Sequence, residues 1–97
     1  MKKIKLGIGS PLRNSVEISI IDISSGEEKT RGKLTAEYTE WDIRPLIKKG
    51  MTLAEVVDDY EEWVYKSLRR HLLDEAEVVE GMEEFRKIVE QRVKDFY

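Results

Sequence analysis

Three residues that could form a catalytic triad share one face of an expected helix. Ser67, His71 and Asp74 are separated by four and three positions, so a helix places their side chains side by side. A serine nucleophile, however, needs its base, its orienting carboxylate and its oxyanion donors to converge on one reacting atom from separate elements. A single helix does not supply that geometry. We therefore expect no catalytic residue here, and we expect His71 to be a helix-end histidine satisfied by Asp74 or by the backbone.

Other chemical signatures are incomplete. Gly7-Ile8-Gly9 follows an expected strand, but the third glycine of a dinucleotide fingerprint would fall at Leu12, where no helix begins. The acidic residues never take the D-x-D-x-D-G order of a calcium loop, and one histidine with no cysteine disfavours a transition-metal site. The sequence therefore predicts no metal and no cofactor, and we expect the protein not to be an enzyme.

Composition restricts the class of protein. The 97 residues, 40% of them hydrophobic, fit one domain over residues 1–97 with a single core. No stretch is apolar enough for a secretion signal or a membrane span, and cysteine is absent, so we expect a cytoplasmic protein without a membrane partner. Charged residues reach 38% and side-chain amides are scarce, a composition typical of heat-adapted proteins.

Residues 1–41 have the pattern of three strands. Ile4, Leu6 and Ile8 alternate with polar residues, and 16–24 is β-branched on both faces, which favours the centre of a sheet. A third alternating run covers 29–41, and Gly, Pro, Asn and Ser separate the three runs. The sequence predicts a three-stranded antiparallel meander.

Residues 42–97 have helical spacing. Asp42 and Pro45 suggest the start of a short helix that ends at Gly50, and Thr52 with Glu55 form a capping box for a long one. A break is expected around 73–81. Two apolar stripes mark the long helices, the first with Leu53, Val56, Val57, Tyr60, Trp63, Val64 and Leu68, the second with Met82, Phe85, Ile88, Val89, Val93 and Phe96. The fold class is thus α+β, with a short helix and two longer helices packed on one sheet face.

Polar residues interrupt both apolar stripes. Ser67 and His71 lie near the middle of the first stripe, and Arg92 lies near the middle of the second. Two interpretations remain open. The helix ends could fray and Arg92 could keep its stem buried with its head in water, or these residues could mark a seam of self-association with a specifying polar contact. A homo-oligomer is therefore one expected form of the protein.

The turn between the expected helices suggests a DNA-reading motif. Residues 46–56, Leu46-Ile47-Lys48-Lys49-Gly50-Met51-Thr52-Leu53-Ala54-Glu55-Val56, resemble the helix-turn-helix segment of small bacterial repressors and antitoxin-like proteins. The resemblance implies that the second helix presents its first turns to DNA. Here those turns carry five acidic residues that would repel phosphate, namely Glu55, Asp58, Asp59, Glu61 and Glu62.

A second nucleic-acid candidate is a ribbon of basic residues on the strands. Its members share one phase of the strand alternation and are Lys3, Lys5, Lys29, Arg31 and Lys33. No aromatic residue interleaves with them as a base-stacking platform requires. The water-exposed face of an antiparallel sheet explains the same pattern. Nucleic-acid binding by the ribbon or by the helix-turn-helix-like segment is kept as the alternative function.

The charge distribution indicates a protein partner. Residues 1–34 carry seven Lys or Arg against four Asp or Glu, whereas residues 35–97 carry ten against sixteen. Acidic residues beside aromatic ones on the first long helix suit a basic partner protein, or a surface that imitates the charge of nucleic acid. We therefore expect a non-enzymatic regulator, inhibitor or adaptor that binds through Asp58, Asp59, Glu62, Trp63 and Tyr65.

Overall fold

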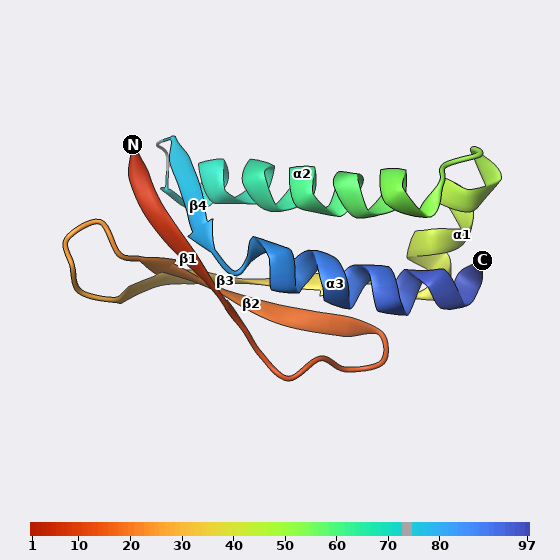
Figure 1. The fold of residues 1–97 in the computed structure, drawn as a ribbon, viewed down its shortest axis with the longest axis horizontal. Coiled ribbons are helices and arrows are strands. Elements are labelled where there is room, and N and C mark those ends of the chain that lie inside the picture. Colours follow the sequence, from red (N-terminus) through yellow and green to blue (C-terminus); the bar gives the residue numbers. More distant parts are fainter. Residues whose placement is uncertain (73–74) are drawn as a thin grey trace.

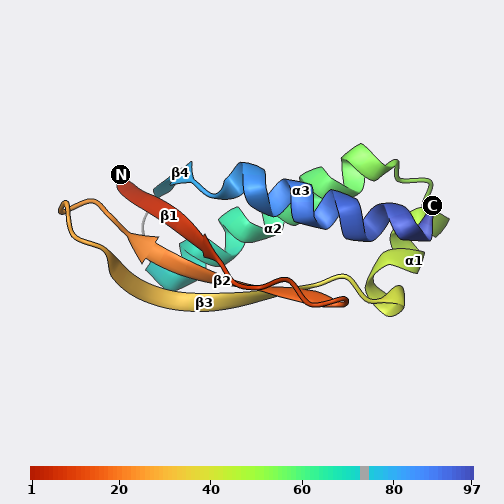
Figure 2. The same cartoon turned by 60° about the horizontal axis from the view of Figure 1, so that its bottom comes forward.

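The computed structural model describes residues 1–72 and 75–97 and confirms the α+β class. Its strands are paired in the order β3-β2-β1-β4, with α2 and α3 side by side over one face of the sheet and α1 at the end where the chain terminates (Figures 1 and 2). The elements are β1 (Lys2–Ile8), β2 (Ser15–Asp22), β3 (Lys29–Glu37), α1 (Glu40–Lys48), α2 (Leu53–Leu72), β4 (Ala76–Glu80), α3 (Met82–Val93) and a 3₁₀ turn (Lys94–Phe96).

The core forms between the covered face of the sheet and the two long helices. Alternate residues of each strand point towards the helices because side chains of a strand alternate between its faces. The helices contribute residues at helical spacing from the predicted stripes. The buried hydrophobic residues of the strands are Ile4, Leu6, Val16, Ile18, Ile20, Leu34 and Ala36, with Tyr38 directly after β3, and those of α2 and α3 are Val56, Val57, Val64, Leu68, Phe85, Val89 and Val93.

A fourth strand occupies the segment where only a break was expected. β4 pairs with β1 in parallel, with Ala76 opposite Lys2 and Val78 opposite Ile4. Gly81 then turns the chain into α3 with a φ of 96°. A Cβ atom at this position would lie 2.4 Å from the carbonyl oxygen of Leu6, so the close approach of β1 requires glycine. The sheet is therefore mixed, with the predicted meander as its antiparallel part.

The start of α1 differs from the prediction. Thr39, not Asp42, is the N-cap, and the two residues form a capping box in which the Thr39 N–H donates to Asp42 Oδ2 at 3.0 Å. The prediction of Asp42 as the cap was wrong because Pro45 was placed in the first turn, whereas it lies inside the helix. Pro45 has no N–H to donate, so the helix loses one internal hydrogen bond there.

The start of α2 agrees with the prediction. The Thr52 N–H donates to Glu55 Oε1 at 3.1 Å, and the Glu55 N–H donates to Thr52 Oγ1 at 3.2 Å. Gly50, with a φ of 84°, ends the preceding helix in the left-handed region that glycine tolerates. The two helices are thus joined by a turn whose geometry the sequence specifies locally.

Candidate functional site

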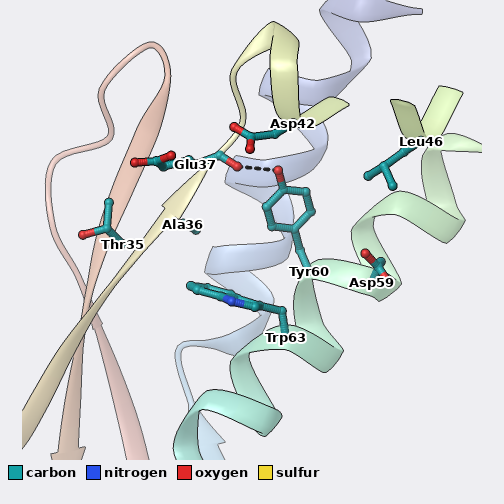
Figure 3. Close-up of a pocket in the computed structure, with 8 residues that line it drawn as sticks. All are labelled: Thr35, Ala36, Glu37, Asp42, Leu46, Asp59, Tyr60 and Trp63. Carbon is teal, nitrogen blue, oxygen red and sulfur yellow. Dashed lines mark hydrogen bonds between the residues drawn. The ribbon is translucent and has the colours of Figure 1, made fainter. Parts of the chain in front are cut away.

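A groove of about 370 Å³ lies between the end of β3, the start of α1 and the middle of α2. Figure 3 shows the residues around it, with Tyr60 and Trp63 reaching from α2 towards β3. Its lining combines carboxylates, two aromatic rings and a small apolar surface. The lining residues are Thr35, Ala36, Glu37, Asp42, Leu46, Asp59, Tyr60 and Trp63.

One side of the groove is the free edge of β3. The Gly9 N–H donates to the Glu17 carbonyl at 2.9 Å, so the backbone of Glu17 faces β1. Thr35, which lies opposite Glu17 in the antiparallel register, must then turn its own N–H and C=O away from β2. Since β3 is the last strand of the sheet, these backbone groups point to the open edge.

Tyr60 bridges this edge to α2. Its hydroxyl donates a hydrogen bond to the backbone carbonyl oxygen of Glu37 (Figure 3). Burial raises the pKa of the Tyr60 hydroxyl, and the nearby carboxylates of Asp42 and Asp59 raise it further because they oppose a tyrosinate. Tyr60 therefore remains a neutral donor that fixes the distance between the helix and the strand.

Two carboxylates flank the tyrosine ring. Asp42 uses Oδ2 for its capping bonds to Thr39, including one of 2.6 Å from the Thr39 hydroxyl. Asp59 has no ion-pair partner among the described residues. The carboxylate of Glu37 turns to the other side of β3, and only its backbone faces Tyr60 (Figure 3). Within residues 1–72 and 75–97, no Lys or Arg lines the groove, so its charge is negative.

Trp63 adds an aromatic face to the groove. It lies four residues after Asp59 and is therefore on the same side of α2. Its half-buried indole lies next to the Tyr60 ring and extends towards β3 (Figure 3). An indole face attracts a cation, and the carboxylates elsewhere in the groove would add to that attraction.

The structure distributes the predicted protein-binding residues over different sides of α2. Asp59 and Trp63 lie together in the groove. Asp58 pairs with Arg86 of α3 at 2.8 Å, and Glu62 pairs with Lys66 at 3.3 Å. Asp58, Glu62 and Tyr65 nevertheless line one common hollow on α2, outside the groove. The five residues therefore fall into two groups, with Asp59 and Trp63 in the groove and the other three around the second hollow.

Sequence reasoning missed most of the groove. Asp42 and Leu46 come from α1, and Thr35, Ala36 and Glu37 come from β3, so no spacing within one element connects them to α2. Tyr60 was recognised only as a member of the apolar stripe. Its hydroxyl was the available signal, because a half-buried tyrosine generally hydrogen-bonds a partner.

The basic ribbon is divided in the structure. Lys33 pairs with Glu17 at 3.4 Å on the open face of the sheet, and Lys5 pairs with Glu28 at 3.7 Å. A bulge in the β2–β3 register lies beside Arg31, which instead pairs at 3.4 Å with the buried Asp22. Lys3 and Lys29 have no ion-pair partner in the described part of the chain.

The triad-like residues do not converge in the described structure. Ser67 is buried, whereas His71 is exposed and packs its imidazole over Gly32 of β3. Asp74 lies outside the described residues. Arg92 is half-buried, and its charge lies close enough to the Tyr38 hydroxyl to oppose the rise that burial causes in the pKa of that tyrosine. The structure thus places Ser67 and Arg92 wholly or partly inside the chain and His71 at its surface.

Comparisons with protein-family models, with curated proteins and with solved structures found no match. Among the residues that the structure describes, no group of three or more His, Asp or Glu is arranged to hold a metal ion. No helix in the same part of the chain is long and apolar enough to cross a membrane.

Proposed function

We propose that this protein is a non-enzymatic binding domain that holds a basic segment of a partner protein, with one arginine or lysine side chain of that segment in the groove between β3 and α2. The observation that carries the proposal is the groove's lining. The side-chain charges there are negative, and the free edge of β3 adds the carbonyl oxygen of Thr35 as a hydrogen-bond acceptor. Such a lining suits a guest that is cationic and rich in N–H donors.

The aromatic residues favour a side-chain guest over a free inorganic ion. A guanidinium or ammonium group over an indole gains about 0.5 to 2 kcal/mol, and Trp63 and Asp59 both line the groove, on either side of Tyr60 (Figure 3). Leu46, which is only partly buried, adds apolar surface for the methylene stem of the guest. A domain that grips a basic segment in this way would act as a regulator, an inhibitor or an adaptor.

Peptide selection tests this proposal. Random decapeptides displayed on phage would be selected on the immobilised protein, and the enriched peptides would be measured by fluorescence anisotropy. We expect an enriched arginine or lysine whose replacement by glutamine weakens binding about tenfold or more, because a charge-assisted hydrogen bond is lost. A pool with no basic residue enriched would overturn the proposal.

Variants of α2 locate the binding site. Asp59→Asn and Trp63→Ala should each weaken the selected peptide about five- to tenfold and reduce its preference for the basic residue. Glu62→Gln is the matched control, because Glu62 is an exposed carboxylate on the same helix, outside the groove. Equal effects of Asp59→Asn and Glu62→Gln would indicate general charge attraction and contradict a specific site.

The nucleic-acid alternative has less support. Three of the five ribbon residues are paired with carboxylates of β2 or of the loop before β3, and the first turns of α2 expose acidic residues. Both features lower the positive potential that phosphate binding requires.

A further inference from the structure

A second surface lies at the end of the molecule where α1 meets the C-terminal turn. Trp41 on α1 is 87% exposed, and Phe96 of the 3₁₀ turn is exposed near it. Between the two elements lies an open hollow of about 1040 Å³. We call this the α1 surface, and its residues are Glu40, Trp41, Arg44, Pro45, Ile47, Lys48, Asp95 and Phe96.

The α1 surface is separate from the groove. Asp42 and Leu46, four residues apart, face the groove, whereas Trp41, Pro45 and Lys48 lie on another side of the same helix. α1 therefore contributes to two surfaces of different character. The groove is acidic, whereas the α1 surface carries two acidic residues, Glu40 and Asp95, and two basic ones, Arg44 and Lys48.

This surface combines an exposed aromatic ring with balanced charge. The Trp41 indole is part of the rim of the hollow, and the charges around it are two of each sign, with Glu40 and Arg44 paired to each other at 2.6 Å. In a two-fold interface both subunits use the same patch. A side chain that projects from one subunit can therefore enter the hollow of the other, and the same contact is made a second time in the reverse direction. A strongly basic or acidic partner would leave half of the charges facing like charges.

We propose that the α1 surface binds a second copy of this chain, with Trp41 of each protomer inserted into the hollow of the other. The balance of charge singles out a second copy over a partner of one charge. Tryptophan is enriched among the residues that contribute most to the binding energy of interfaces. In the dimer, the two-fold axis would bury the Trp41 indole of both protomers. This dimer does not depend on the groove having a ligand.

Sedimentation equilibrium of the full chain tests the proposal. We expect a reversible monomer–dimer equilibrium in the wild type, and Trp41→Glu should weaken it at least about thirtyfold because a charge would enter each hollow. Leu12→Glu is the matched control, since Leu12 is 66% exposed and outside the α1 surface, and it should remain dimeric. Far-UV circular dichroism would confirm that both variants are folded.

Charge reversal provides a second test. Arg44→Glu with Lys48→Glu makes the rim wholly acidic, and Glu40→Arg with Asp95→Lys makes it wholly basic. Each double variant should be monomeric alone, and an equimolar mixture should form a heterodimer because opposite rims then meet. A wild type that stays monomeric up to about 1 mM, a dimer indifferent to Trp41→Glu, or a mixture that stays monomeric would each overturn the proposal.

Discussion

Asp22 shows how one carboxylate can be stable on the buried face of a sheet. It follows Val16, Ile18 and Ile20 in the alternation of β2 and is only 5% exposed. The Ser24 N–H donates to Asp22 Oδ1 at 3.0 Å, and Lys2 lies 3.5 Å from its other oxygen. These hydrogen bonds, the one from Ser24 above all, lower the Asp22 pKa to about 2 from 3.8. The contacts with Ser24 and Lys2 therefore favour the ionised form of Asp22.

Replacing Asp22 by asparagine should change the acid limb of the stability curve. Because the folded pKa is the lower one, the ionised carboxylate stabilises the fold above about pH 4, and this contribution is lost as the pH falls towards 2. Thermal unfolding from pH 7 to pH 2 should show the wild type losing its advantage over Asp22→Asn across that range. Glu17→Gln, an exposed carboxylate of the same strand, is the control. A wild-type advantage that stays constant down to pH 2 would contradict the role assigned to Asp22.

The Tyr60 hydroxyl should contribute to stability as well as to the groove. Tyr60→Phe leaves the Glu37 carbonyl without its donor, so we expect the free energy of unfolding to fall by about 1 kcal/mol. Urea denaturation measures the difference. In the described structure the Tyr65 hydroxyl makes no hydrogen bond to protein, so Tyr65→Phe should change stability by less than about 0.5 kcal/mol. Equal losses in both variants would show that ring packing, not the hydroxyl, carries the effect.

At the level of elements, the turn from β4 to α3 depends on one glycine. Gly81→Ala would place a methyl group 2.4 Å from the Leu6 carbonyl oxygen, forcing β1 and β4 apart. We expect a loss of at least about 3 kcal/mol in the free energy of unfolding. Gly50→Ala is the comparison, since Gly50 has a similar φ of 84° but nothing within 4 Å, and it should cost only about 1 to 2 kcal/mol. Similar losses at both positions would mean that the strained backbone, and not the contact with Leu6, causes the loss of stability at Gly81.

The elements that the sequence predicted are those with local signals. The meander followed from alternation and turn residues, and the start of α2 followed from the Thr52–Glu55 box. β4 has only five residues, and just Ala76 and Val78 are half-buried in it. Its partner is β1, more than 70 residues earlier in the sequence. No pattern within residues 76–80 indicates that they pair in parallel with so distant a strand. β4 could therefore not be predicted from these five residues.

At the scale of the whole molecule, the groove and the α1 surface both require elements that are distant in the sequence. Asp59 and Trp63 were predicted because charge and aromatic character occur together on one helix. Asp42 lies in the groove with them only because α1 follows at the end of β3. Phe96 lies near Trp41 only because the chain ends beside α1 (Figure 1). Composition gave the acidic character of the helical half, but the placement of that charge depends on tertiary packing.

The two tryptophans give each surface its own fluorescent reporter. Trp63→Phe leaves Trp41 on the α1 surface, and Trp41→Phe leaves Trp63 in the groove. Dilution should red-shift the emission of the Trp63→Phe protein, because a dissociating dimer returns Trp41 to water. A selected basic peptide should change the emission of the Trp41→Phe protein at any dilution, because the groove is complete within one chain. A response of Trp41 to peptide would contradict independent surfaces, since it would require binding in the groove to move the opposite side of α1.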